Sequence, residues 1–340
     1  MKKSASRLTY RKAGVDIAGA DAFVHFALAA SRRTHGKSVV PHRLGYSGLV
    51  RAGNQLLAAT CDGVGTKLLV ARAAGQFEGL GQDLVAMSVN DLLPVGATPL
   101  FFLDYIAVGA LQRRMMDPLL QSIVRACRES GCALLGGETA EMPGVYAPGH
   151  FDLAGFAVGL VEGGRLPKPE SMRAGDVVLG LPSTGLHSNG FSLARKALLG
   201  RGRYRLSTRV PDLGTTLAEA LLVPTALYPK PVLALHRAHG FRAAAHVTGG
   251  GLWGRARKLA TKGLGLRLDM AALSPSPLFG LIARAGHIRT DEMLRTFNMG
   301  AGFIAVVSPK AAAWALKARL GFRALGTVEQ SKRPLVVEGM

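Results

Sequence analysis

The stretch Gly136-Gly137-Glu138-Thr139-Ala140-Glu141-Met142-Pro143-Gly144 combines a diglycine with two carboxylates. It follows a short apolar run, residues 133–135, which predicts a strand. The diglycine lets the backbone approach a ligand closely, and Glu138 and Glu141 place two carboxylates three residues apart. Surface acids in a turn are the alternative interpretation. Taken with the acids described next, this stretch predicts one wall of a nucleotide site.

A second acidic turn follows the predicted strand 56–61. It reads Asp62-Gly63-Val64-Gly65-Thr66-Lys67. A carboxylate, two glycines and a lysine can place Mg²⁺, backbone N–H groups and a cation around phosphates. The spacing is not that of a GxxxxGK[ST] loop, so a plain glycine turn stays open as the alternative.

The predicted helix 82–93 carries polar residues within an apolar segment. Asp83 and Asn90, seven residues apart, share one stripe of this helix, and Asp91 lies beside it. Buried polar groups are costly without partners, and a metal or nucleotide can be that partner. Six acids in the first half of the chain adjoin apolar runs: Asp62, Asp83, Asp91, Asp104, Glu138 and Glu141. The pattern predicts a carboxylate-lined Mg²⁺–nucleotide site.

Two further turns are candidate anion sites. Gly185-Leu186-His187-Ser188-Asn189-Gly190 precedes the predicted helix 191–199, so hydroxyl and N–H groups gather at a helix N-terminus. His187 is a candidate acid, base or phosphate donor. Thr248-Gly249-Gly250-Gly251 lies at another strand–helix junction, directly after His246. Three consecutive glycines indicate a close backbone approach, by a phosphate or by tight packing.

The length of 340 residues predicts two domains, and the Gly- and Pro-containing segment 162–169 is the expected linker, giving domains 1–165 and 170–340. Strands are also expected at 177–181 and 303–307. Asp117 is the expected cap of a helix beginning at Pro118 and ending at Gly131, and Ser308-Pro309 opens a helix that Gly321 closes. No apolar run approaches the ~18 residues of a membrane span, and three scattered cysteines argue against a disulfide framework. We therefore expect a cytoplasmic protein.

The formal net charge is +20, and it is unevenly distributed. Residues 1–165 carry 17 Lys and Arg against 13 Asp and Glu, whereas residues 166–340 carry 25 against 9. The densest run is Arg201, Arg203, Arg205 and Arg209. Aromatic residues make up only 6%, and no stacking motif accompanies the charge, so nucleic acid is an unlikely partner. A basic surface suits anionic small substrates.

Taken in order, these motifs resemble the phosphoribosylformylglycinamidine cyclo-ligase (AIR synthetase) family over nearly the whole chain. The resemblance begins at Tyr10-Arg11-Lys12-Ala13-Gly14-Val15-Asp16-Ile17 and ends at residues 292–302. The segments GGETAEMPG and HSNG are its most specific parts.

The resemblance implies an α+β fold of two domains. The N-terminal mixed or antiparallel sheet would pair into a barrel across a homodimer, and the C-terminal domain would be an α/β sandwich. It implies ATP-dependent ring closure of formylglycinamidine ribonucleotide to aminoimidazole ribonucleotide, with Mg²⁺ as cofactor and a monovalent cation such as K⁺ left open.

Roles for the motif residues follow from the resemblance. Asp62 and Asp91 would hold Mg²⁺. Catalysis would involve His187, Asp91 and Glu138, and Ser188, Asn189 and Gly249–Gly251 would bind the ribose phosphate. The nucleotide would be bound by Asp62, Gly63, Gly65, Lys67, Asp83, Asn90, Gly136, Gly137 and Glu141.

The chain departs from the family pattern at several positions. Phe26-Ala27-Leu28 stands where the family usually has an active-site lysine, and Arg32, Arg33 or Lys37 could replace it. The glycine-rich loop is reduced to Leu44-Gly45-Tyr46-Ser47-Gly48. Thr98, Ala226 and the segment Gly254-Arg255-Ala256-Arg257 also differ. Two alternatives stay open: another enzyme of the same superfamily, and a divergent, weakly active or non-catalytic nucleotide-binding paralog.

Overall fold

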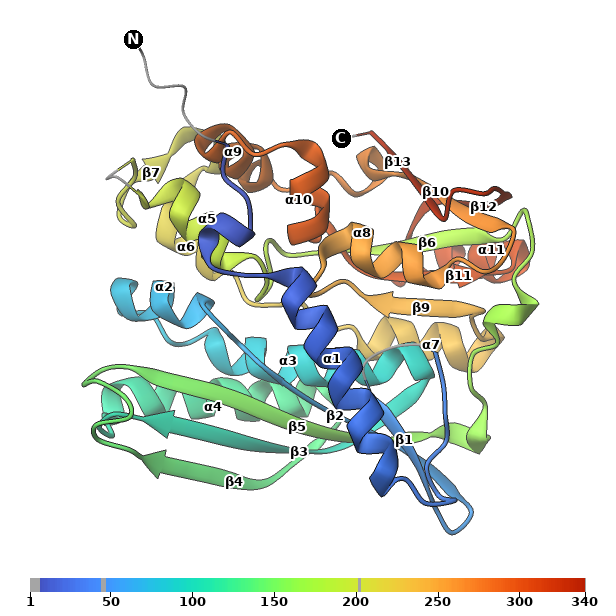
Figure 1. Ribbon diagram of the computed structural model, residues 1–340, viewed down its shortest axis with the longest axis horizontal. Coiled ribbons are helices and arrows are strands. Elements are labelled where there is room, and N and C mark those ends of the chain that lie inside the picture. The colour runs from blue at the N-terminus through green and yellow to red at the C-terminus, as the bar shows by residue number, and fades with distance from the viewer. Residues whose placement is uncertain (1–6, 44–46, 201–202, 340) are drawn as a thin grey trace.

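The computed structural model describes residues 7–43, 47–200 and 203–339; the loop residues Leu44–Tyr46 and Arg201 named above lie outside them. The chain folds around two large sheets with helices against both, as Figure 1 shows. The strands are β1 Gly48–Ala52, β2 Gln55–Gly63, β3 Ala97–Val108, β4 Ala133–Glu141, β5 Phe151–Val161, β6 Val177–Pro182, β7 Arg209–Val210, β8 Thr215–Thr216, β9 Ala243–His246, β10 Leu264–Asp269, β11 Ala301–Val307, β12 Arg323–Gln330 and β13 Leu335–Glu338. The helices are α1 Ile17–Ser31, α2 Lys67–Ala74, α3 Leu80–Leu92, α4 Arg113–Ser130, α5 Phe191–Leu198, α6 Leu217–Leu222, α7 Pro229–His239, α8 Gly251–Ala256, α9 Pro277–Gly286, α10 Thr290–Thr296 and α11 Pro309–Lys317.

The first sheet has the strand order β1-β2-β5-β3-β4, in which only the β3–β4 pair is parallel. Its core side chains, such as Phe102, Ile106 and Leu153, pack against α3 and α4. Figure 1 shows these two helices on one side of the sheet. Among the described residues no helix covers the other side, where Phe156 and Tyr105 each keep 39% of their surface exposed. The sheet is therefore mixed and has one open face.

The second sheet has the order β13-β10-β12-β6-β11-β9 and is covered on both faces. One core layer joins it to α5, α8, α9 and α10, and a second joins it to α7 and α11. The β11 strand is buried at all seven positions, as expected of a central strand between two helical layers. The expected α+β fold, with a mixed N-terminal sheet and a C-terminal sandwich, is confirmed.

Two expected elements differ from the structure. The helix expected to begin at Pro118 begins five residues earlier, at Arg113, and Pro118 lies inside it. Met115 and Met116 are buried, so packing extends the helix upstream of the proline, while Asp117 pairs with Arg113 at 2.7 Å instead of capping. The helix opened by Ser308 begins as expected but ends at Lys317, four residues before Gly321.

The GGETAE segment is a strand and not a turn. The β4 strand runs from Ala133 to Glu141 and pairs in parallel with β3. A Cβ on Gly137 would lie 2.3 Å from the Asp104 carbonyl oxygen, so the glycine allows the edge strand to approach its neighbour. Gly137 therefore serves close packing of the edge strand, whereas a Cβ on Gly136 would meet nothing within 4 Å.

Helix α3 joins the two halves of the molecule. It packs against the first sheet and also donates and accepts hydrogen bonds with the loop that precedes α7. Twelve of its thirteen residues are buried, including Asp83, Asn90 and Asp91. The polar stripe predicted on this helix therefore faces the other half of the chain.

Candidate active site

Asp62 and Asp91 come from adjacent elements of the first domain. Asp62 lies near the end of β2, and Asp91 lies in the last turn of α3. Burial raises the pKa of Asp62 to about 6, the negative charge of Asp91 adds to this effect, and the Gly63 N–H and His246 oppose it. Two carboxylates whose charges repel in a buried place are suited to a divalent cation.

His246 holds Asp91 from the other half of the chain. It ends strand β9, and its Nδ1 lies 2.9 Å from Asp91 Oδ1. The ring is buried, and its Nε2 has no hydrogen-bond partner among the described residues. The contact fixes the orientation of the Asp91 carboxylate across the domain boundary.

His187 lies in the turn after β6 with a positive φ of 59°, which is uncommon for a residue other than glycine. It is 1% exposed, and its Nε2 accepts a hydrogen bond from the Thr184 N–H at 3.2 Å. Burial lowers the pKa of His187 well below its ordinary value, and the charges of His246 and Lys67 lower it further. The ring is therefore neutral, and the network assigns its proton to Nδ1. This N–H is buried and has no partner among the described residues, so it can donate to a substrate.

Tyr228 connects the two histidines. Its ring centroid lies 6.1 Å from that of His187 and 6.4 Å from that of His246. Its hydroxyl donates to the Pro182 carbonyl at 2.8 Å, and its backbone N–H donates to Asn90 Oδ1 at 3.0 Å. A Cβ on Gly302 would lie 1.8 Å from the Tyr228 hydroxyl, so only glycine fits there. The result is a rigid aromatic wall that includes both histidines.

The structure places Lys67 and Asp83 in a fully buried ion pair. The ammonium lies 2.7 and 2.9 Å from the two Asp83 oxygens and donates to the Val223 carbonyl at 2.8 Å. Asp83 also accepts from the N–H and hydroxyl of Thr225 and from the Ser188 hydroxyl. The sequence predicts that Lys67 and Asp83 bind nucleotide. In this structure their side chains bond to residues of the second domain and so hold the two domains together.

The glycines of the predicted turns are needed for different reasons: some allow a close approach of the backbone, and others allow a left-handed conformation. A Cβ on Gly251 would lie 2.4 Å from the Leu294 carbonyl oxygen, and a Cβ on Gly63 would lie 2.8 Å from that of Leu153. Gly65 has a φ of 69° with open space around it, as a left-handed turn requires. Gly249 lies near the Asn189 side-chain oxygen and the Arg255 guanidinium, so these turns from β9 and β6 meet.

The residues of β4 lie away from this cluster within one chain. Asp62, Gly155, Asp104 and Gly137 form one row across four strands, which places Gly137 roughly 14 Å from Asp62 at the usual strand spacing. Glu138 is exposed on the edge strand. The Glu141 carboxylate accepts a hydrogen bond from the Leu111 N–H at 2.9 Å. Gly136 and Glu138 therefore face outward, at the margin of the open sheet face.

Several site residues carried weak signals in the sequence. His246 and Tyr228 were not assigned a role, although a histidine that ends the apolar strand Ala243–His246 is a usable signal. Thr225 carries no local signal, because its partner Asp83 lies 142 residues away. Arg255 is buried and donates to the Thr248 hydroxyl, and burial lowers its pKa to about 9.

The structure shows the contacts and the exposure of the residues that depart from the family pattern. Ala226 contributes its carbonyl oxygen to Asn90 at 2.9 Å. Thr98 donates to Glu162 at 2.7 Å, and Glu162 pairs with Arg237 across the domain boundary. Helix α1 carries Phe26 and Leu28 exposed, and no residue of this helix is buried. Arg32, Arg33 and Lys37 follow that helix and are exposed, so a replacement of the lysine by any of them stays a prediction.

The fold and this site define a class of protein. Residues 45–161 match the family model described as AIR synthase related protein, N-terminal domain, and residues 173–337 match the model of its C-terminal domain. The chain is 47% identical to a phosphoribosylformylglycinamidine cyclo-ligase of Sorangium cellulosum over 92% of this chain and 91% of the relative. It is 44% identical to that of Carboxydothermus hydrogenoformans over 97% and 98%. The chain belongs to the phosphoribosylformylglycinamidine cyclo-ligase family, as its motifs predicted, and is an enzyme of that class.

Solved structures support the fold at lower identity. The structure described as "AaThiL complexed with AMPPCP and TMP" has a TM-score of 0.63 at 18% identity and covers 93% of each chain. A hydrogenase maturation protein HypE in complex with ATP has a TM-score of 0.60 at 19% identity, covering 84% of this chain and 82% of that one. Among the described residues no helix is both long and apolar enough to cross a membrane.

Proposed function

We propose that this chain closes the imidazole ring of aminoimidazole ribonucleotide from formylglycinamidine ribonucleotide, at the expense of ATP. The observation that carries the proposal is the chain of contacts between the two domains that leads from Asp62 and Asp91 through His246 and Tyr228 to the buried, neutral His187. The names of the relatives and the ATP-bound neighbours point to the same substrates.

The reaction needs a poor leaving group to be made a good one. The γ-phosphoryl group of ATP passes to the formyl-derived amide oxygen of the substrate, and ADP leaves. The neighbouring nitrogen then attacks that carbon, the C–O bond breaks, and inorganic phosphate leaves as the ring closes. Phosphoryl transfer of this kind depends on positioning and charge neutralisation more than on covalent catalysis.

Asp62 and Asp91 are the residues that would hold Mg²⁺, which would neutralise phosphate charge when bound. Among the described residues no group of three or more His, Cys, Asp or Glu side chains could hold a metal ion. Two carboxylates suffice for Mg²⁺ when phosphate oxygens and water complete its coordination. The donor set therefore fits a cation that arrives with its nucleotide.

His187 would donate its Nδ1–H to the amide oxygen of the substrate. Its Nε2 already accepts the Thr184 N–H, so the ring cannot rotate without losing that bond. The Asn189 and Gly249 turns, with the Arg255 guanidinium beside them, would receive the ribose phosphate. We assign Lys67 and Asp83 to holding the domains together, in place of the phosphate contact that the sequence predicts.

We also propose a homodimer that closes the open face of the first sheet. Glu138 and Gly136 lie at the margin of that face, so they would reach a nucleotide bound near the dimer interface. This arrangement would give the β4 residues a role that a single chain cannot supply.

The test is ADP release by the purified protein with Mg-ATP, in the presence and absence of formylglycinamidine ribonucleotide. We expect release to require the substrate. In His187→Ala and His187→Asn we expect a fall of at least tenfold. Asparagine tolerates a positive φ, so His187→Asn separates lost chemistry from backbone strain. Full activity in His187→Asn would remove the histidine from the mechanism, and substrate-independent release would contradict the reaction.

A further inference from the structure

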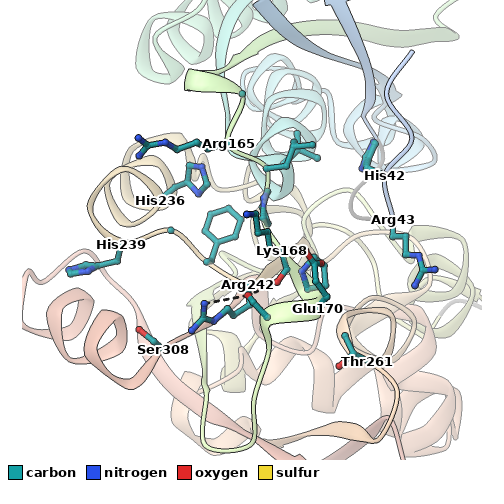
Figure 2. Close-up of a pocket in the computed structure, with 18 of the residues that line it drawn as sticks. His42, Arg43, Arg165, Lys168, Glu170, His236, His239, Arg242, Thr261 and Ser308 are labelled. Carbon is teal, nitrogen blue, oxygen red and sulfur yellow. Dashed lines mark hydrogen bonds between the residues drawn. The ribbon is translucent and has the colours of Figure 1, made fainter. Parts of the chain in front are cut away.

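A large cavity lies outside the candidate active site and shares none of its residues. Its volume is about 1210 Å³, which exceeds the ~300–1,000 Å³ of typical ligand pockets. Its walls come from the segment between β5 and β6, the end of α7, the loop before β9 and the segment before β1. Figure 2 shows the cavity with these walls around it.

The described residues that line the cavity are strongly basic. Five are Arg or Lys, three are His, and Glu170 is the one acid. Two of the cations have carboxylate partners: Arg237 pairs with Glu162 at 2.6 Å and Arg242 with Asp176 at 3.5 Å. Within the part of the chain that the structure describes, Arg165, Lys168 and Arg43 have no ion pair. Their charge is therefore uncompensated.

Two histidines of the wall have unpaired buried nitrogens. His42 Nε2 lies 2.6 Å from the Ser47 carbonyl oxygen, but its Nδ1 is buried and has no partner among the described residues. His236 Nδ1 is also buried without a partner among the described residues, although the Arg165 backbone interacts with the ring and opposes the lowering of its pKa by burial. The His236 ring is held between Phe241, at 4.6 Å between centroids, and the Cα of Gly96, where a Cβ would meet the ring at 2.3 Å. Buried polar groups normally have partners, so both histidines are candidate contacts for a ligand of the cavity.

The cations lie on different sides of the cavity. In Figure 2, Arg165 lies beside His236 on one side, Arg43 lies beside His42 on the other, and Lys168 and Arg242 lie between them. An anion that extends from one side of the cavity to the other would contact more of these cations than an anion bound at one side alone.

We propose that this cavity is a binding site for a small molecule with two or more linked phosphate groups. The phosphates would contact Lys168 and Arg165, and the histidines would supply further hydrogen bonds. Such a molecule could be inorganic or a nucleotide, since both share the phosphoanhydride group. The helix α7 that ends in this cavity begins directly after Tyr228, which lines the candidate active site, so one helix contacts both places.

The experiment is calorimetric titration of the full chain with inorganic pyrophosphate, in EDTA and at about 0.15 M salt, where diffuse surface attraction is largely screened. Arg165→Ala/Lys168→Ala is the test variant. Arg203→Ala/Arg205→Ala is the matched control, because it removes the same charge from exposed positions outside the cavity. We expect the test variant to lose at least tenfold in affinity and the control to change less than twofold.

Equal losses in both variants would show diffuse attraction by a basic surface, and unchanged affinity in the test variant would place the anion elsewhere; either result overturns the proposal. Absence of any pyrophosphate binding would also overturn the proposal. So would a result in which RNA binding depends on Arg165 and Lys168 but pyrophosphate binding does not.

A second titration, with ADP, shows whether the bound molecule is a nucleotide or an inorganic diphosphate. If ADP binds more tightly than pyrophosphate, and this binding is lost only in the test variant, the ligand is a nucleotide. If ADP and pyrophosphate bind with equal affinity, the site recognises the diphosphate group alone. Because Arg165 and Lys168 lie outside the candidate active site, this test is independent of ADP release from ATP.

Discussion

Asp62 shows how a single residue can trade stability for function. Its carboxyl is largely desolvated beside Asp91, and its pKa rises from 3.8 to about 6. A buried carboxylate without a bound cation destabilises the folded state. The same carboxylate would bind the metal ion of a nucleotide.

We predict that Asp62→Asn stabilises the metal-free protein at pH 7. The raised pKa means that the folded state binds the proton more tightly than the unfolded state, so the wild type loses stability as the pH rises from about 4 to about 6. The variant does not have this loss, and at about 1.4 kcal/mol per unit we expect it to be more stable by about 1–3 kcal/mol at pH 7. Denaturant unfolding in EDTA at pH 7 and at pH 4.5 measures the difference.

The two pH values provide an internal control, since charges remote from Asp62 contribute equally to the stability of both proteins. The advantage of the variant must shrink at pH 4.5, where Asp62 is mostly protonated in the folded wild type. Added Mg-ATP is expected to raise the melting temperature of the wild type more than that of the variant. An advantage that is constant with pH would contradict the raised pKa.

At the scale of elements, α3 carries the contact between the two halves of the molecule. Its Asp83 accepts from Thr225 and Ser188 and pairs with Lys67 of α2, all without access to water. Removing one member of such a pair leaves the other charge buried and unpaired.

We predict that Asp83→Asn lowers stability by about 3–5 kcal/mol, because the Lys67 ammonium loses its counter-ion. Lys67→Met in the same background is expected to restore a large part of that loss, since it removes the unpaired charge and keeps a long apolar chain. Denaturant unfolding of the four proteins of this double-mutant cycle gives the coupling. Additive losses in the double variant would show that the two residues do not act as a pair.

In helix α4 we predict a substitution that raises the stability of the protein. Pro118 lies inside Arg113–Ser130 and cannot donate to the carbonyl of Arg114. We expect Pro118→Ala to stabilise the protein by about 1–3 kcal/mol, since proline costs about 3 kcal/mol in a helix interior and the local backbone has already adapted. Thermal unfolding with Leu120→Ala as a control, exposed on the same helix, measures it. An unchanged or lowered melting temperature would show that the proline is accommodated without cost.

For the whole molecule, local sequence patterns predict more of the elements than of their contacts. The strands at Val177–Pro182 and Ala301–Val307 and the start of α11 follow from apolar runs and from Ser308-Pro309. The burial and the partners of Lys67 do not follow from the local sequence, because its carbonyl partner Val223 lies 156 residues away in the other half of the chain. A lysine beside glycines has the same local pattern whether it meets a phosphate or a buried carboxylate.

The same limit explains why β4 extends to Glu141, beyond the strand predicted at residues 133–135. A diglycine usually ends a strand, and only the nearby Asp104 of β3 shows why this strand continues through it. His246 and Asp91, 155 residues apart, are brought together by the packing of β9 against the end of α3. Motif order identifies the family, whereas the pairing of its polar residues depends on tertiary structure.

The open face of the first sheet carries exposed apolar side chains, among them Phe156 and Tyr105. Phe156 of β5 lies opposite Leu103 of β3 and beside Cys61 of β2, so these side chains share the face that no described helix covers. An exposed apolar sheet face of this kind is typical of an interface between chains. We predict that the wild type has twice the 35.7 kDa chain mass in solution and that Phe156→Glu is a monomer, because the interface would bury an unpaired charge. Light scattering after size-exclusion chromatography measures both, with Leu316→Glu on α11 as a control at similar exposure, 42% against 39%. A monomeric wild type, or a dimer that survives Phe156→Glu, would show that the open face is not the interface and would leave Glu138 without a partner's site to complete.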